Sequence, residues 1–278
     1  MEVIKKINYC WFGYNPLPDS AKKCIESWKK YCPDFEIIQW NEGNFDIDSC
    51  DYVKEAYKRK RWAFVSDYAR FWILYNYGGL YFDTDVELIS PIDDIISRGA
   101  FMGLEREFDF RKITNETRFK EMKTEVAHGL GLYANPGLGL YANPGLGLYA
   151  EILDNYNKRH FIDEKGNDDI TTVVKIVSDI LSDKQIEKVD DISMQIADVY
   201  LYRKDVFCPM DYKTGKINFT DNTRSIHHYS ASWMTEEELM MHKIFIKSKN
   251  IFGERVGRVI GGTLALPKMI KINLKRNK

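Results

Sequence analysis

The stretch GGLYFDTDVELI, residues 78 to 89, decides the fold prediction because two carboxylates, Asp83 and Asp85, follow an apolar run. Residues Leu80 to Leu88 are rich in aromatic and branched side chains, which predicts a strand. Side chains alternate along a strand, so the two carboxylates are expected on one side. They repel each other unless a cation neutralises them, and oxygen ligands favour Mg²⁺ or Mn²⁺. The sequence therefore predicts a metal-bound diphosphate at the end of this strand.

The residues before the two glycines predict a buried helix. Residues 62–77 are apolar nearly all round, and Gly78 is placed to end the helix in the left-handed conformation. Asp67 and Arg70 interrupt this pattern and share a face because they lie three residues apart. An internal ion pair accounts for both charges. Burying such a pair rarely repays its desolvation, so a polar ligand on that face accounts for them at least as well.

Strand and helix patterns alternate along the chain, which predicts an α/β fold with a parallel sheet. The other expected strands are residues 6–12 and 35–40, and the other expected helices are residues 20–31, 51–61, 151–160 and 171–181. With 278 residues, the chain is long enough to bury a substantial core.

Two segments stand apart from this alternation. The octapeptide GLGLYANP occurs twice within residues 129–150 and a third time through Ala150, which indicates a local insertion. Its glycine spacing does not fit a nucleotide-binding loop. Residues 243–278 form a basic tail with ten Lys or Arg and one acid, Glu254.

Composition excludes several classes of protein. A formal net charge of -1 argues against general nucleic-acid binding. The five cysteines are odd in number and contain no Cys-Xaa-Xaa-Cys pair, so reduced thiols in a cytosol are expected. No apolar run has the length of a signal peptide core or a membrane span. We therefore expect a cytoplasmic protein.

Four motifs carry a resemblance to a known family. They are YCWFG at residues 9–13, WAFVSDYAR at 62–70, YGGLYFDTD at 77–85 and HHYSASW at 227–233. In this order, over roughly residues 4–235, the chain resembles the sugar transferases of glycosyltransferase family 32, which contain the DXD sugar-binding region. This family includes fungal mannosyltransferases and bacterial capsular-polysaccharide transferases, and the large glucosylating cytotoxins share much of the pattern.

The resemblance implies a GT-A domain over residues 1–242, with a Rossmann-like, mixed and mostly parallel sheet that binds a nucleotide sugar. At the end of the strand, it implies that Asp85 ligates the metal and that Asp83 meets the ribose or a metal-bound water. His227 is the expected further metal ligand or diphosphate contact, and His228 is the alternative. Tyr81 is expected to line the nucleotide pocket, although it could also face the core.

The other implied residues surround the donor. Trp11 is expected to stack on the nucleotide base, with core packing as the alternative. Ser66, Asp67 and Arg70 are expected to hold donor groups, the last two toward the sugar, while Ser66 could instead bond within its helix. Trp233 is expected to shape the donor pocket or to anchor the last loop.

The expected activity is metal-dependent transfer of a hexose from a nucleotide-diphosphate sugar to a saccharide or a lipid-linked oligosaccharide, with retention, in polysaccharide biosynthesis. A phosphatase of the Asp-Xaa-Asp-Xaa-Thr type is an alternative, but Glu87 stands where that threonine is needed. A catalytically silent sugar-nucleotide binder is another, because an insertion at 129–150 could spoil acceptor binding. The basic tail could contact the anionic inner face of a membrane, or it could be a solvated end.

Overall fold

The computed structural model describes residues 3–114, 116–123, 126–127, 132–134, 147–211, 215–230 and 244. Residues 1–210 and 217–228 form one compact unit, and residues 211–216 and 229–278 form another. The helices and strands named below all belong to the first unit.

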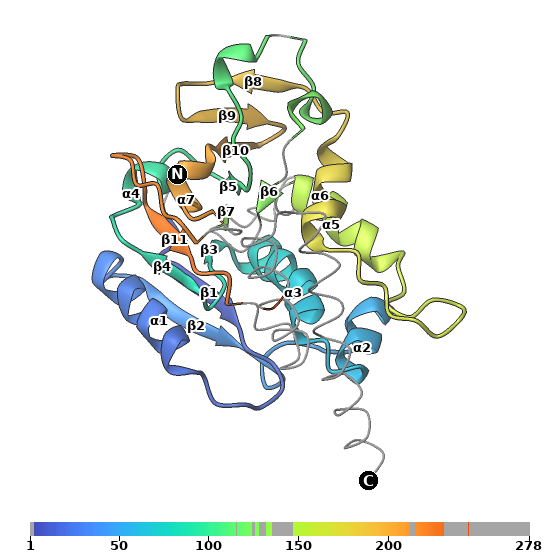
Figure 1. Cartoon of the computed structure of the whole chain (residues 1–278). Helices are drawn as coiled ribbons and strands as arrows, with labels where there is room; N and C mark the ends of the chain where they lie inside the picture. The colour runs from blue at the N-terminus through green and yellow to red at the C-terminus, as the bar shows by residue number, and fades with distance from the viewer. Residues whose placement is uncertain are drawn as a thin grey trace. The chain divides into compact units, whose positions relative to one another are not determined.

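A nine-stranded sheet forms the centre of the described part of this unit (Figure 1). Its order is β2-β1-β3-β7-β5-β10-β9-β8, with β6 paired to β5. The strands are β1 Lys6–Cys10, β2 Glu36–Trp40, β3 Gly79–Tyr81, β5 Phe101–Leu104, β6 Val126–Ala127, β7 Leu132–Ala134, β8 Ile186–Lys188, β9 Ser193–Ile196 and β10 Val199–Tyr202.

Strand direction in this sheet is mixed but mostly parallel. Strand β1 pairs in parallel with β2 and β3, and β5 pairs in parallel with β10. Strand β7 is antiparallel to both β3 and β5, so these two run the same way. Strand β8 has that direction too, because it is antiparallel to β9, which is antiparallel to β10. Strands β1, β2, β3, β5, β8 and β10 thus oppose β6, β7 and β9, which confirms the predicted mixed α/β sheet.

The predicted helices are confirmed, most of them with shifted ends. The helices are α1 Asp19–Tyr31, α2 Asp51–Lys58, α3 Trp62–Tyr77, α4 Asp93–Ile96, α5 Gly147–Asn157, α6 Val173–Leu181 and α7 Lys204–Phe207, with 3₁₀ turns η1 Phe110–Lys112 and η2 Phe119–Met122. Helix α3 has the predicted bounds and packs against β1, α2 and α5. It is buried because its side chains are apolar on nearly every face.

Two glycines place β3 against β1. Gly78 ends α3 at φ +66° and ψ -164°, a conformation open essentially to glycine and different from the predicted left-handed one. Gly79 has φ +91°, and a Cβ there would lie 2.7 Å from the carbonyl oxygen of Lys6. The buried Asn8 side chain donates to the carbonyl oxygens of Gly78 at 3.2 Å and Leu80 at 2.9 Å. The end of α3 is thereby fixed to the sheet.

The prediction of one strand over Leu80–Leu88 is wrong. Strand β3 ends at Tyr81, and β4, Val86–Leu88, pairs antiparallel with β11, Ser225–His227, in a separate sheet. Between them, Val86 N–H donates to the Asp83 carbonyl at 3.0 Å and closes a turn. The indole N–H of Trp28 in α1 donates to the Val86 carbonyl at 2.7 Å. The chain turns here because β4 packs against α1 and pairs with β11 rather than continuing β3.

The repeated segment shows how context overrides local sequence. Leu-Tyr-Ala of the first copy forms β7, whereas the same tripeptide at residues 148–150 lies in α5. The remainder of the predicted insertion, residues 129–131 and 135–146, lies outside the described residues, as does the tail apart from residue 244.

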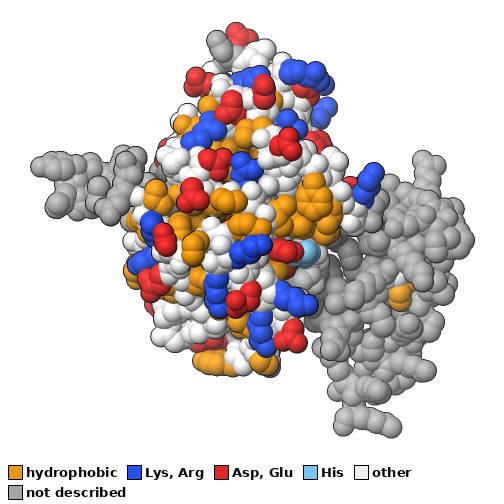
Figure 2. All heavy atoms as spheres, turned by 90° about the vertical axis from the view of Figure 1, so that its left-hand side faces the viewer, with side chains coloured by type: hydrophobic (Ala, Val, Ile, Leu, Met, Phe, Trp, Pro, Cys, Tyr) orange, Lys and Arg blue, Asp and Glu red, His pale blue; other side chains and the backbone are white. Residues whose placement is uncertain are grey.

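The described surface carries charges of both signs. Figure 2 shows acidic and basic side chains interspersed with apolar ones over one face. Within the described residues, the search for a helix long and apolar enough to span a bilayer finds none.

Candidate functional site

The turn between β3 and β4, residues 82–85, brings three predicted site residues together, and we call it the carboxylate turn. Asp83 and Asp85 come from the turn, and His227 comes from β11, where it stands opposite Val86. One ligand atom from each of the three side chains lies within 4.8 Å of the others. His227 Nε2 is 3.2 Å from Asp85 Oδ1. The carboxylates therefore converge, although a turn rather than strand alternation places them.

The structure distinguishes the two adjacent histidines. His227 faces Asp85, whereas His228 Nε2 lies 2.7 Å from Glu87 Oε2. The backbone N–H of His228 donates to the Asp85 carbonyl at 3.0 Å and ties the turn to β11. Neighbouring side chains on an extended segment point to opposite sides, so only His227 of this pair reaches the two aspartates.

His227 supplies positive charge to the site. Burial alone lowers the pKa of His227, but the Asp85 carboxylate outweighs burial and, with the neighbouring Cys208, raises this pKa to about 10. A positive charge on His227 would offset the negative charge of the adjacent Asp85 carboxylate. Cys208 is fully buried, and the sequence analysis missed it because a single cysteine far from the motifs gives no signal.

Arg70 links α3 to the turn. Its side chain is 5% exposed, with Nη2 2.9 Å from Asp67 Oδ1 and 3.4 Å from Asp83 Oδ1. Its Nε donates to the Ser66 carbonyl at 3.1 Å. The predicted internal ion pair is present, and it extends to the carboxylate turn. Burial raises the pKa of Asp67 to about 7, although the nearby Arg70 guanidinium acts in the opposite direction and lowers this pKa.

Tyr81 lies beneath this network. It is 1% exposed, and its hydroxyl donates to Asp83 Oδ1 at 3.1 Å. The Arg70 guanidinium carbon lies 5.1 Å from the centre of the Tyr81 ring, within the range of a cation–π contact. Tyr81 thus faces the core, which was the alternative considered for it, and its hydroxyl also orients Asp83.

The remaining predicted residues differ in their surroundings. Trp11 follows β1, is half-buried, and donates its indole N–H to the Asn15 carbonyl at 2.6 Å. Ser66 donates its hydroxyl to the Trp62 carbonyl at 3.0 Å, the bond within the helix that was the alternative for it. Trp233 lies outside the described residues.

The donor set fits a hard divalent cation. Two carboxylate oxygens and one imidazole nitrogen within 4.8 Å match the ligands that Mn²⁺ or Mg²⁺ takes from proteins. Binding requires the neutral imidazole, so His227 would release its proton as the cation takes over its charge. Glu87 stands where a phosphatase of the Asp-Xaa-Asp-Xaa-Thr type has its threonine. Its carboxylate bonds to His228 and offers no hydroxyl group of the kind that the threonine provides.

Comparisons with known proteins agree on one class. Residues 18–102 match the glycosyltransferase sugar-binding region containing a DXD motif. Inositol phosphoceramide mannosyltransferase 1 of Schizosaccharomyces pombe is 26% identical over 113 residues, which are 37% of this chain and 34% of that protein. The chain therefore matches about a third of this relative's length.

Two solved structures are also similar. The PaToxG glycosyltransferase has a TM-score of 0.37 and 17% identity, covering 65% of this chain and 68% of its own. The galactosyltransferase LgtC, solved with donor and acceptor sugar analogs, has a TM-score of 0.43 and 12% identity, covering 93% of this chain and 95% of its own. The match over residues 18–102, which include Asp83 and Asp85, confirms the resemblance to DXD glycosyltransferases.

Proposed function

Because residues 18–102 carry the DXD sugar-binding region of glycosyltransferases, we propose that the chain is a GT-A glycosyltransferase. It moves a hexose from a nucleotide-diphosphate sugar to a saccharide or lipid-linked oligosaccharide during polysaccharide biosynthesis. The observation that carries this proposal is the convergence of Asp83, Asp85 and His227 beside Arg70. Asp83 and Asp85 follow the carboxyl end of β3, and ligands of open α/β sheets bind outside the carboxyl ends of strands.

In this proposal, Asp85 and His227 hold Mn²⁺ or Mg²⁺, and Asp83 contributes directly or through a bound water or the donor ribose. The cation, when bound, neutralises charge on the donor diphosphate. The turn is suited to this role because the hydroxyl of Tyr81 and the guanidinium of Arg70 fix the Asp83 carboxylate from two sides. A fixed carboxylate needs little reorganisation on binding.

The α3 side of the site faces the transferred sugar in this proposal. Arg70 stabilises negative charge at the leaving diphosphate, and Asp67 binds sugar hydroxyls. Ser66 is assigned to hold donor groups beside them, and its carbonyl group accepts from Arg70 Nε. We assign no covalent nucleophile, so transfer with retention proceeds by front-face displacement, in which the leaving phosphate accepts the acceptor's proton.

The nucleotide end of the donor lies toward Trp11 in this proposal. Trp11 follows β1, and β1 and β3 pair in parallel, so Trp11 and the carboxylate turn share one sheet edge. Its indole N–H is held by a loop carbonyl, which leaves the ring orientation defined for stacking on a base.

The basic tail is assigned to an anionic membrane surface on the cytoplasmic side. Its ten Lys or Arg against one acid over residues 243–278 favour attraction to such a surface, where a lipid-linked acceptor would lie. Co-sedimentation with anionic liposomes tests this assignment. The full chain should pellet more than a chain ending at Lys243, and equal pelleting would refute the membrane contact.

A thermal-shift panel of UDP and GDP sugars, with and without Mn²⁺, tests the transferase proposal. A ligand that binds only the folded state at about 100 times its Kd adds about 2.7 kcal/mol. Asp85→Asn should abolish the Mn²⁺-dependent part of the shift. The matched control is Glu87→Gln, which removes a nearby carboxylate that faces His228 and should keep the shift.

The outcomes separate the alternatives. Transfer of the sugar from the bound nucleotide sugar to an acceptor supports the transferase, whereas hydrolysis of the donor without transfer indicates that the insertion at 129–150 has spoiled acceptor binding. A metal-dependent shift without transfer or hydrolysis identifies a silent sugar-nucleotide binder. If Asp85→Asn leaves the shift unchanged, the assignment of the site is wrong.

A further inference from the structure

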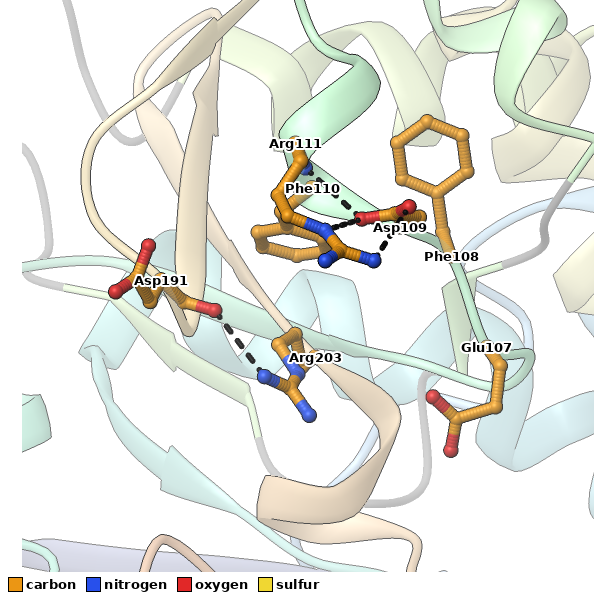
Figure 3. A pocket seen from close by; sticks show the side chains of 7 residues that line it. All are labelled: Glu107, Phe108, Asp109, Phe110, Arg111, Asp191 and Arg203. Carbon is orange, nitrogen blue, oxygen red and sulfur yellow. Dashed lines mark hydrogen bonds and ion pairs between the residues drawn. The ribbon is translucent and has the colours of Figure 1, made fainter.

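A cavity of about 620 Å³ lies beside strands of the central sheet (Figure 3). The residues that line it are distant in sequence from the carboxylate turn. Residues 107–111, Asp191 and Arg203 line it. None of these residues belongs to the motifs that predicted the donor site. The cavity therefore needs an explanation of its own.

Strand direction places this cavity at the sheet edge that carries the carboxylate turn. Residues 107–111 follow the carboxyl end of β5, and Arg203 follows the carboxyl end of β10. Strands β3, β5 and β10 run in the same direction. Strand β7 separates β3 from β5, so two inter-strand spacings, about 10 Å, lie between the ends of β3 and β5. A chain of a few sugars extending from a donor at Asp83 along this edge would reach the cavity.

Each of the two arginines of the cavity pairs with a nearby carboxylate, Arg111 at the exposed surface and Arg203 beside a buried one. Arg111 Nε and Nη2 contact Asp109 Oδ1 and Oδ2 at 2.8 and 3.0 Å. Arg203 Nε lies 3.0 Å from a carboxylate oxygen of the buried Asp205, and its Nη1 donates to the Asp191 carbonyl at 3.3 Å. Figure 3 shows Arg111 with Asp109 on one side of the space and Arg203 with Asp191 on the other. The Arg203 guanidinium group, held by the buried Asp205 and the Asp191 carbonyl, recognises a ligand with little loss of side-chain entropy.

The lining has the mixed chemistry of a polyol site. Glu107 offers a carboxylate that accepts hydrogen bonds, and the arginines donate them. Phe108 is half-buried and packs 6.2 Å from the buried Phe110 ring, so it brings a supported apolar surface to the cavity. Sugar hydroxyls both donate and accept, and the C–H face of a sugar ring packs on aromatic rings. Acidic and basic side chains are nearly balanced here, which favours an uncharged ligand over an anionic one.

We propose that this cavity binds the acceptor of the reaction, and that the acceptor is a neutral oligosaccharide. The inference rests on the proposed transferase function and adds the place and the chemical class of the acceptor. Phe108 stacks on a sugar ring, Arg111 and Glu107 bind its hydroxyls, and the chain end extends along the sheet edge toward Asp83.

Direct binding tests this assignment without requiring turnover. The full chain is applied to an array of neutral oligosaccharides that end in glucose, galactose or mannose, together with sialylated and sulfated ones. Titration calorimetry with the best neutral binder then compares wild type with Arg111→Ala and Phe108→Ala. Lys112→Ala is the matched control, because Lys112 is exposed, adjacent and outside the cavity. The Arg111 side chain is 86% exposed, so its removal should leave the fold intact.

Arg111→Ala and Phe108→Ala should each weaken oligosaccharide binding about tenfold or more, whereas Lys112→Ala should change the Kd less than about twofold. The Mn²⁺-dependent thermal shift with a nucleotide sugar should stay the same in all three variants. Binding of anionic glycans alone, no binding of any glycan, or an unchanged Kd in both cavity variants would overturn the assignment. A missing nucleotide-sugar shift in wild type would instead refute the transferase function, and the oligosaccharide Kd would still decide the cavity.

Discussion

Replacing Arg70 with methionine should destabilise the fold strongly. The change removes a guanidinium group that contacts Asp67 at 2.9 Å and Asp83 at 3.4 Å, while keeping a long apolar side chain. Removing one partner of a buried ion pair costs about 3–5 kcal/mol because the other charge stays buried without compensation. That other charge is Asp67, whose side chain is 12% exposed, whereas the Asp83 side chain is 29% exposed and keeps access to water. We therefore expect the free energy of unfolding to fall by about 3–5 kcal/mol at pH 8.

The loss should depend on pH in a defined direction. Burial raises the pKa of Asp67 to about 7, Arg70 lowers it and Asp83 raises it. In the unfolded chain this pKa is about 4, so keeping Asp67 ionised in the folded state costs stability as the pH rises between these two values. Without Arg70, the folded-state pKa rises further. The deficit of Arg70→Met should therefore be smaller at pH 5, where Asp67 carries a proton, than at pH 8.

Urea unfolding in EDTA, which keeps divalent cations out of the site, measures these free energies. Asp67→Asn added to Arg70→Met should recover most of the loss at pH 8, because it removes the uncompensated charge. Arg59→Met is the control: its side chain is 45% exposed and pairs with Asp168 at 3.5 Å, so the loss should stay below about 1 kcal/mol. If Arg70→Met costs no more than this control, or if the double variant is no more stable than the single one, the buried pair does not have the role inferred for it.

Three further changes test other parts of the structure. His227→Asn should abolish the Mn²⁺-dependent thermal shift with a nucleotide sugar, while His228→Asn should retain it, and the reverse result would exchange their roles. Gly79→Ala should cost about 3 kcal/mol in urea unfolding, from positive-φ strain and a 2.7 Å contact with a backbone carbonyl of β1, whereas Gly166→Ala meets only the strain, about 1 kcal/mol. Burial alone raises the pKa of Glu55, but its hydrogen bonds to a histidine and two backbone N–H groups outweigh burial and lower it. Glu55→Gln should therefore cost about 1 kcal/mol at pH 7, and this cost should shrink as the pH falls through the lowered pKa of the wild-type carboxylate; a difference that does not change on acidification would contradict the assigned pKa shift.

The sequence predicted those elements whose signal is local. Helix α3 has its predicted bounds because a segment that is apolar on nearly every face over about four turns is stable as a buried helix, and Gly78 ends it. The shared helix face of Asp67 and Arg70 also followed from helical spacing alone, and the ion pair was one of the two explanations that this spacing left open. The tripeptide Leu-Tyr-Ala shows the limit of this reasoning, because identical residues form β7 in one copy and begin α5 in another.

Elements that depend on distant partners were predicted less well. The strand expected over Leu80–Leu88 breaks because β4 pairs with β11, about which the local sequence carries no information. The choice between His227 and His228 depends on the register of β11 against β4, and that register appears only when both strands are placed. The cavity beside Arg203 joins segments after β5 and β10, which become neighbours only through parallel pairing.

The break between β3 and β4 has a consequence for the site. A continuous strand would orient both carboxylates through its own backbone, but a turn depends on what surrounds it. Here Tyr81 and Arg70 hold Asp83, while His227 and the backbone N–H of His228 hold Asp85. The two aspartates are thus positioned by different parts of the chain, one by α3 and β3 and the other by β11. Since the cation ligands come together only when β11 pairs with β4, cation binding and the docking of β11 should stabilise each other.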